Sequence, residues 1–263
     1  MPVITNTQAS VTDSGGSGEV IVLLHGFLSS SRYWSKLRPL LLRDGYRIIT
    51  IDLLGFGRAP KPQLADYSYE EHSKYIEAAL RSLAIVQPFV IIGHSMGALL
   101  AARYSIRHPD TITAAILLHP PLYKDPQNAR ATLRKTGMLY RFLLDSPYRN
   151  LGWLLVKHGN LSPIGKHSHQ AREQSLAAII EAAEIFSDLE AMAVKTLVVV
   201  GKYDRKEYTD NLSELGVHNP RVTVSVEAVD HHSPRKHPTL VKDRIVWFIQ
   251  KRVSALSNQA LQK

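Results

Sequence analysis

The sequence predicts an α/β fold built on a mainly parallel, doubly wound sheet with an inserted helical segment. Short apolar runs rich in Val and Ile, typical of buried parallel strands, alternate with helical patterns along most of the chain. The alternation stops between Pro120 and Lys195, where only helical patterns occur. Alternating strands and helices imply a parallel sheet covered on both faces, and 263 residues suffice for one such domain.

Six apolar runs are predicted to be the buried parallel strands. In chain order they are residues 20–24, 48–51, 89–92, 114–118, 197–200 and 222–226. The helices predicted to cover the sheet are residues 33–42, 68–83, 96–107 and 240–253. Ser68 and Glu71 have the spacing of a capping box at the start of the second helix. His108-Pro109 ends the third helix, because proline cannot continue it.

Residues 122–193 are predicted to form a helical cap inserted into a core of residues 1–121 and 194–263. Within the cap, helical patterns cover residues 129–144, 151–156 and 170–186. Ordinary helices packed on the sheet are the alternative interpretation, but a plain crossover needs far fewer residues. Large apolar cap side chains are predicted to contact the substrate, namely Leu139, Phe142, Leu143 and Trp153.

The composition narrows the function classes. No apolar run is long enough to span a bilayer, and the polar residues 1–20 lack the features of a signal peptide. The chain has no cysteine, which excludes disulfides, thiolate metal sites and a thiolate nucleophile. We therefore expect a cytoplasmic protein without integral membrane association, and no oligomeric state is predicted.

The chain carries a formal net charge of +9 at pH 7. Its Lys and Arg residues are dispersed, without a recognition motif or an array of stacking aromatic side chains, so nucleic acid is not predicted as a partner. A basic solvated surface is the simpler interpretation. A further hypothesis is that the charge attracts anionic substrates or anionic lipid surfaces.

The most informative motif is Gly93-His94-Ser95-Met96-Gly97, between a predicted strand and a predicted helix. A serine flanked by two glycines at such a turn is typical of the nucleophile elbow of serine hydrolases, although the five residues alone also occur in ordinary turns. The tight turn strains the serine backbone and exposes its hydroxyl above the sheet. The Met96 amide then lies at the positive end of the helix, where developing negative charge is stabilised.

A serine nucleophile needs a base, and the base needs an orienting acid. Asp204 directly follows the predicted strand at residues 197–200, and the pair His231-His232 follows the last predicted strand. In doubly wound sheets, such groups lie on loops beyond the carboxyl ends of strands. The order Ser, Asp, His is the order that an α/β-hydrolase arrangement requires.

Four motifs together make the chain resemble the α/β-hydrolase superfamily, in its serine-dependent form with a helical cap. The first strand leads into His25-Gly26-Phe27, which resembles the family's oxyanion loop. Residues 52–58 resemble its Asp-x-x-Gly-x-Gly loop, residues 93–97 its elbow, and Asp204 and His231 its acid and base. The resemblance implies an α/β-hydrolase fold over nearly the whole length.

The resemblance also implies roles for individual residues. Ser95 would attack the substrate carbonyl, His231 would take the serine proton and return it to the leaving group, and Asp204 would orient the imidazole. The backbone N–H groups of Phe27 and Met96 would hold the oxyanion. No metal or organic cofactor is implied.

Two adjacent histidines compete for the role of base. The family usually has a proline seven positions after this histidine, and counting from His231 reaches Pro238, which favours His231 over His232. The family also usually has a glycine where this chain has Asp230. That acidic residue could instead contact a histidine itself.

Other polar residues receive structural interpretations. His25 is expected to order the oxyanion loop, His94 to pack beside the nucleophile, and Asp52 to brace its own loop. Three histidines at positions 158, 167 and 169 lack the spacing and carboxylates of a zinc site, so no metal is predicted.

The predicted function is hydrolysis of a carboxylic ester with a hydrophobic acyl or aromatic part, through an acyl-serine intermediate. The predicted partner is thus a small ester-like substrate. A carbon–carbon bond hydrolase, a lactonase or a perhydrolase would use the same three residues. The alternative from another class is a catalytically weak ligand-binding protein on the same fold, and an active-site fluorophosphonate probe distinguishes the two classes.

Overall fold

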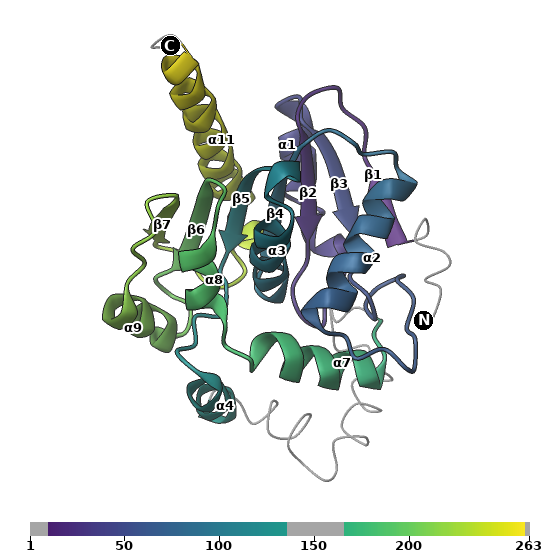
Figure 1. Ribbon diagram of the computed structural model, residues 1–263, viewed down its shortest axis with the longest axis vertical. Coiled ribbons are helices and arrows are strands. Elements are labelled where there is room, and N and C mark those ends of the chain that lie inside the picture. Colours follow the sequence, from purple (N-terminus) through teal and green to yellow (C-terminus); the bar gives the residue numbers. More distant parts are fainter. Residues whose placement is uncertain (1–9, 136–165, 261–263) are drawn as a thin grey trace.

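A computed structural model describes residues 10–135 and 166–260 of the chain, with the side chains of residues 10–135 and 166–251. Its centre is a seven-stranded sheet in the order β1-β3-β2-β4-β5-β6-β7 (Figure 1). All neighbouring strands are parallel except the edge pair β1 and β3, which is antiparallel. The α/β-hydrolase fold predicted from the sequence is thereby confirmed.

The six predicted strands are present with small changes at their ends. They are β2 (Val20–Leu24), β3 (Arg47–Ile51), β4 (Phe89–His94), β5 (Ile112–Leu118), β6 (Thr196–Gly201) and β7 (Val222–Glu227). β7 was predicted to be buried, and this is wrong, because it is the sheet edge and its side chains are half-buried or exposed. The sequence analysis missed β1 (Val11–Asp13), which has only three residues and pairs antiparallel.

Helices cover both faces of the sheet, and each face has its own apolar core. Along β2, Val22 and Leu24 face one core, whereas Ile21 and Leu23 face the other. The first core contains side chains from α2 (Tyr69–Ser82), α3 (Met96–Arg107) and α8 (Ile185–Ala191). The second contains side chains from α1 (Arg38–Arg43) and α11 (Pro238–Ala260). The inner strands β2 to β6 are therefore mainly apolar on both faces, as their continuous hydrophobic runs require.

Several helices differ in detail from the prediction. Residues 33–42 form a 3-10 helix, η2 (Ser31–Trp34), and then the separate helix α1, which begins beside Pro39. The capping box of α2 is confirmed in part. The Ser68 hydroxyl accepts from the Glu71 amide at 3.4 Å, whereas the Glu71 carboxylate accepts from the Tyr67 amide one residue further back. The last helix, α11, extends beyond the predicted bounds at both ends.

Short helices lead out of β5 and back into β6. They are α4 (Pro126–Lys135), α7 (His169–Ser175), a π-helical turn η5 (Leu176–Ile180) and α8. The single helix predicted over residues 170–186 is thus wrong, since it changes to π-helix after Ser175 and a new helix begins at Ile185. The predicted substrate contacts Leu139, Phe142, Leu143 and Trp153 lie outside the described residues.

Polar contacts attach this helical stretch to the core. The Tyr69 hydroxyl donates to the Ile179 carbonyl at 3.2 Å, and Arg103 on α3 forms ion pairs with Glu184 and Asp188. The described helices include none that is long and apolar enough to cross a membrane.

Other connections join the remaining strands. The short turn η3 (Pro109–Thr111) precedes β5, and α9 (Lys206–Leu215) connects β6 to β7. A one-turn helix, α10 (Ser233–Lys236), lies between β7 and α11. The loops that follow β2, β4, β5, β6 and β7 meet at the carboxyl edge of the sheet, which faces downward in Figure 1.

His72 is buried between α2 and α7, where its Nε2 atom lies 3.3 Å from the Ser175 hydroxyl. Burial lowers the pKa of His72 from its usual 6.5 to about 3. Between these two values the unfolded chain binds a proton that the folded chain does not. The titration of His72 therefore leaves the free energy of unfolding unchanged above about pH 6.5 and lowers it as the pH drops below that value.

We expect His72→Gln to flatten the acid dependence of the free energy of unfolding. Between about pH 6 and pH 4, the slope should decrease by about 1.4 kcal/mol per pH unit, because one proton no longer binds on unfolding. Urea titrations at a series of pH values measure this slope. The exposed His218 provides the control, and an equal change for His218→Gln would contradict the assignment.

Candidate active site

Ser95 lies at the sharp turn between β4 and α3. Its backbone has φ 54° and ψ −122°, a conformation that costs a non-glycine residue of the order of 1–3 kcal/mol. The two glycines allow the turn because any side chain would collide. A Cβ on Gly93 would lie 2.0 Å from the Gly97 carbonyl oxygen, and one on Gly97 would lie 2.4 Å from the Leu24 carbonyl oxygen. The small residues of the motif are therefore required by close packing.

The loop after β2 approaches the elbow from the other side. A Cβ on Gly26 would lie 3.1 Å from the Ser95 Cβ, so the backbone before Phe27 passes close to the serine. His25 orders this loop: its Nδ1 donates to the Gly26 carbonyl at 2.8 Å, and its Nε2 accepts from the Leu53 amide at 3.0 Å. These two bonds hold the imidazole neutral, and burial lowers its pKa. The expectation that His25 orders the loop agrees with this geometry.

Met96 is the first residue of α3, so its amide lies in the helix's first turn, where N–H groups have no intrahelical acceptor. The Ser95 amide has its own acceptor, since it donates to the Leu118 carbonyl at 2.9 Å. The geometry thus places the Met96 amide beside Ser95, across from the Phe27 loop, with the positive end of the helix dipole behind it.

Asp204 and His231 lie together although they are 27 positions apart in the sequence. The His231 Nδ1 lies 2.7 Å from the Asp204 Oδ2, and the Asp204 Oδ1 accepts from the Arg205 amide at 2.7 Å. Burial acts to raise the pKa of Asp204, but the hydrogen bond and charge of His231, helped by the Arg205 amide, outweigh it and lower the pKa. The carboxylate therefore stays ionised and holds the imidazole with Nδ1 protonated.

The sequence left open that Asp230 contacts a histidine side chain, but its carboxylate has other partners in the structure. Asp230 accepts from the His232 backbone amide at 2.8 Å and forms an ion pair with Lys236. Its carboxylate therefore closes the turn that leads into α10. Of the two adjacent histidines, His231 makes the hydrogen bond to Asp204.

His94 is buried next to the nucleophile and supports the loop that carries His231. Its ring stacks on Tyr33 with centroids 4.4 Å apart, and its Nε2 donates to the His231 carbonyl at 2.7 Å. Burial, reinforced by the neighbouring histidines, lowers the pKa of His94 well below 6.5, so the ring stays neutral. This is the packing role expected from the sequence.

His119 is a residue of the site that the sequence analysis missed. It directly follows β5, has a positive φ of 51°, and is almost completely buried. Its Nδ1 lies 3.7 Å from the Asp204 Oδ2, and its Nε2 lies 2.6 Å from the Ser233 hydroxyl. Burial lowers its pKa to about 4. Its position at a strand end, the same signal that identified Asp204, could have revealed it.

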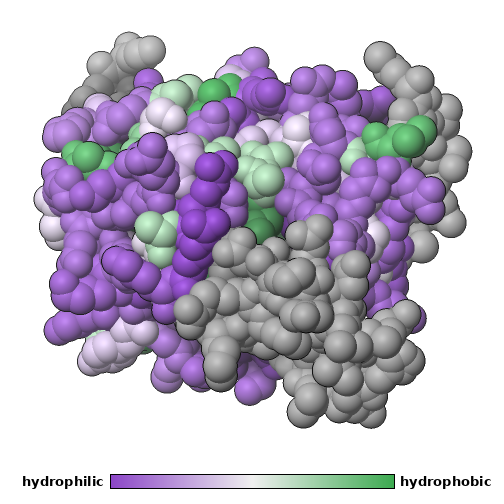
Figure 2. All heavy atoms as spheres, turned by 90° about the horizontal axis from the view of Figure 1, so that it is seen from below, coloured by the Kyte–Doolittle hydropathy of each residue, from purple (hydrophilic) through white to green (hydrophobic). Residues whose placement is uncertain are grey.

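The described residues enclose a pocket of about 240 Å³ at the carboxyl edge of the sheet. Its lining includes Phe27, His94, Ser95 and both adjacent histidines, together with Tyr33 and Arg235. Figure 2 shows this side of the molecule, where the described surface is mainly hydrophilic with a small hydrophobic area in the middle. Within the described part of the chain, no group of three or more His, Asp or Glu side chains is arranged to hold a metal ion.

The structure therefore brings together the predicted site residues that it describes. Ser95 and His231 line one pocket, Asp204 bonds to His231, and the loop of Phe27 faces the first turn of α3. Such an arrangement can supply a nucleophile, a base, an orienting carboxylate and two amide donors for a developing oxyanion. Tyr33, His119 and Arg235 are additions that the sequence analysis did not identify.

Comparison with known proteins gives a family match. A protein-family model described as alpha/beta hydrolase fold matches residues 19–152, just over half of the chain. A curated relative, "Probable lysophospholipase BODYGUARD 2" of Arabidopsis thaliana, is 38% identical over 122 residues, which cover 45% of this chain and 26% of the relative. "Uncharacterized hydrolase YugF" of Bacillus subtilis is 36% identical over 100 residues, covering 38% of this chain and 36% of that protein. The matches thus span much less than two thirds of these relatives.

Solved structures share the fold over most of the length. An esterase from Exiguobacterium antarcticum has a TM-score of 0.70 and 21% identity, covering 91% of this chain and 94% of its own. A bromoperoxidase from Bacillus anthracis has a TM-score of 0.69 and 23% identity, with the same coverage. At these identities the similarity establishes the fold alone.

Proposed function

The chain belongs to the alpha/beta hydrolase fold family, and from this premise we propose that it is a serine esterase. The reaction is hydrolysis of a carboxylic ester through an acyl-serine intermediate. The observation that carries this proposal is the 2.7 Å hydrogen bond between His231 and Asp204, made at the pocket that Ser95 also lines. Relatives named as hydrolases and as probable lysophospholipases support the same reaction class.

The first half of the reaction forms the acyl enzyme. His231 takes the Ser95 proton through Nε2 while the serine oxygen attacks the ester carbonyl. The positive charge that forms on the imidazole is stabilised by Asp204, whose lowered pKa keeps it ionised. The amides of Met96 and Phe27 stabilise the oxyanion, and each such donor is worth about 3 kcal/mol in related enzymes.

The first half ends when His231 donates its proton to the departing alcohol, which leaves the acyl-serine. The second half releases the acid: His231 takes a proton from water, which attacks the acyl-serine carbonyl. The tetrahedral intermediate collapses, the carboxylic acid leaves, and Ser95 recovers its proton. Because His94 and His119 are held neutral by burial, they can support the charged His231 with little electrostatic cost.

A series of 4-nitrophenyl esters with acyl chains from two to twelve carbons tests the proposal. We expect turnover with a burst of nitrophenol equal to the enzyme concentration when deacylation limits the rate. The chain length with the highest kcat/KM defines the acyl part of the substrate.

Absence of both burst and turnover for every ester in this series would contradict the esterase proposal. It would favour the ligand-binding alternative. Turnover of lactones alone would instead assign the site to lactone hydrolysis, which uses the same three side chains.

A further inference from the structure

A second, larger pocket adjoins the one that contains Ser95. It has a volume of about 670 Å³ and follows the loop after β2, η2, and the loop after β3. The polar groups that line it are mainly hydroxyls and basic side chains. The basic side chains are those of Arg32, Arg38, Arg58, Lys166 and Arg235, and the hydroxyls include those of Thr12, Ser29, Ser30 and Ser35. We call this pocket the basic groove.

Four of its cations have no carboxylate partner in the described part of the chain. Arg32 and Arg235 are exposed on η2 and α10, Arg38 begins α1, and Lys166 lies in the loop before α7. The ion pairs of the described residues involve none of these four side chains. Unpaired cations that converge on one cavity produce a positive potential inside it.

Asp52 is the one acidic residue among the described residues that line the groove, and its charge is already compensated. It is 1% exposed and accepts from the Ser31 amide at 2.6 Å and from the Arg58 amide at 2.9 Å. Burial acts to raise its pKa, but these amides, with the nearby His25, outweigh it and lower the pKa. As expected from the sequence, the buried carboxylate braces its own loop.

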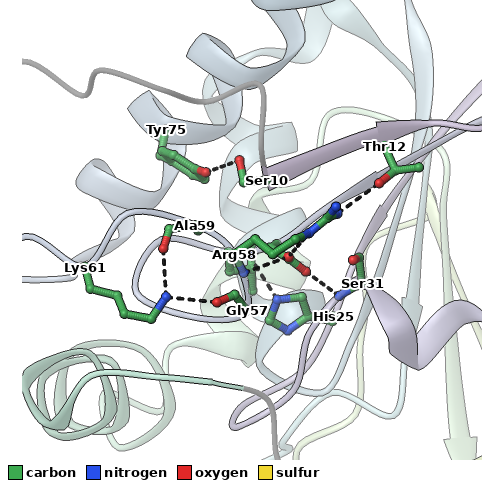
Figure 3. Close-up of polar contacts among 11 residues, drawn as sticks. Ser10, Thr12, His25, Ser31, Gly57, Arg58, Ala59, Lys61 and Tyr75 are labelled. Carbon is green, nitrogen blue, oxygen red and sulfur yellow. Dashed lines mark hydrogen bonds and ion pairs between the residues drawn. The ribbon is translucent and has the colours of Figure 1, made fainter.

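Arg58 is held in place by this carboxylate. Its Nε donates to Asp52 at 3.2 Å, and its Nη2 donates to the Thr12 hydroxyl at 3.0 Å (Figure 3). Lys61 fixes the same loop by donating to the carbonyls of Gly57 and Ala59, both at 2.9 Å. Among the described residues that line the groove, Asp52 therefore compensates the charge of Arg58, and the four unpaired cations determine the net charge.

The groove continues into the pocket of the nucleophile. Ser29, Tyr33 and Arg235 line both. A ligand whose ester carbonyl lies at Ser95 can therefore place a second group among the basic side chains. Electrostatic attraction favours an anion there, and guanidinium groups with hydroxyls suit an oxyanion.

We propose that the basic groove binds a phosphate group carried by the ester substrate. Four unpaired cations and the hydroxyls of Thr12, Ser29, Ser30 and Ser35 offer more charge and more donors than a single carboxylate can use. A phosphate monoester has up to two negative charges and three terminal oxygens, which matches this supply. The inference rests on the proposed esterase function and specifies its substrate class.

The test compares two soluble esters that differ only in phosphate: 1-hexanoylglycerol and 1-hexanoylglycerol 3-phosphate. We expect the unmodified protein to have at least a tenfold higher kcat/KM for the phosphate-bearing ester. In the double variant Arg32→Gln/Arg38→Gln, the ratio of the two kcat/KM values should fall about tenfold. Raising the salt concentration should lower the same ratio in the unmodified protein, because exposed charges are screened.

The matched control is Arg107→Gln/Arg221→Gln, which removes the same charge at exposed positions outside the groove. It should preserve the ratio of the unmodified protein. An equal fall in both double variants would mean that net charge alone attracts the substrate, which overturns the proposal. Turnover of the neutral ester with no preference for phosphate also overturns it but leaves the esterase function intact. Failure to hydrolyse either ester, together with inactivity toward nitrophenyl esters, refutes the esterase function itself.

Discussion

Replacing Ser95 with alanine is expected to lower ester turnover roughly 10⁴-fold or more, as removal of the nucleophile does in other serine hydrolases. Covalent labelling by a fluorophosphonate probe should disappear as well, because the probe reacts with an activated serine oxygen. The strained backbone at φ 54° presents this hydroxyl to the pocket shared with His231. Nitrophenyl ester turnover and gel fluorescence after labelling measure the two effects.

Two variants serve as controls for this result. Ser213→Ala removes an exposed hydroxyl from α9, and it should leave labelling and turnover unchanged. Ser95→Gly removes the hydroxyl while relieving the positive φ, so it should be inactive yet as stable as the unmodified protein or more stable. Labelling that persists in Ser95→Ala would show that another residue is the nucleophile.

Replacing His231 with alanine is expected to reduce kcat roughly 10⁴-fold or more, with a much smaller change in KM. The same change at His232 should have less than a tenfold effect. The reason is geometric, because His231 makes the 2.7 Å hydrogen bond to Asp204 and thereby has its tautomer fixed. Steady-state kinetics of the two variants with one nitrophenyl ester provide the comparison.

Labelling at high pH separates loss of the base from loss of the fold. His231→Ala should retain slow fluorophosphonate labelling that rises as hydroxide replaces the missing base, whereas an unfolded variant would not label at any pH. Loss of activity in His232→Ala with an active His231→Ala would reverse the assignment. Circular dichroism should show both variants folded, since the His231 side chain is half-buried and the His232 side chain is exposed.

Much of the fold follows from local patterns. All six runs of apolar residues became neighbouring strands, and five of them, β2 to β6, left a continuous hydrophobic signal because they are buried on both faces. The elbow, the capping serine of α2 and the loop-bracing role of Asp52 were recognised from residues near them in sequence, although Asp52 also accepts from the more distant Ser31 amide. Strands with weaker signals were misjudged: β1 is too short to show a pattern, and β7 alternates because it is an edge.

The site was predictable where it depends on position at a strand end. Ser95, Asp204 and His231 all directly follow or lie near the carboxyl ends of strands, and the structure brings them to one edge. His119 has the same kind of position, but a lone histidine after a strand has no motif to draw attention to it. Tyr33 and Arg235 could not be found this way, because they reach the pocket from η2 and α10.

By itself, the sequence determined the strand-and-helix order, the strained serine turn, and the candidate acid and base. These are encoded by hydrophobic periodicity, by glycines that only a close backbone approach requires, and by chain order. The spacing to Pro238 favoured His231, but only the tertiary structure shows this side chain hydrogen-bonded to Asp204, and only it gathers dispersed basic residues into one groove beside Ser95. Both depend on packing between segments far apart in the chain, and no local pattern records where such segments meet.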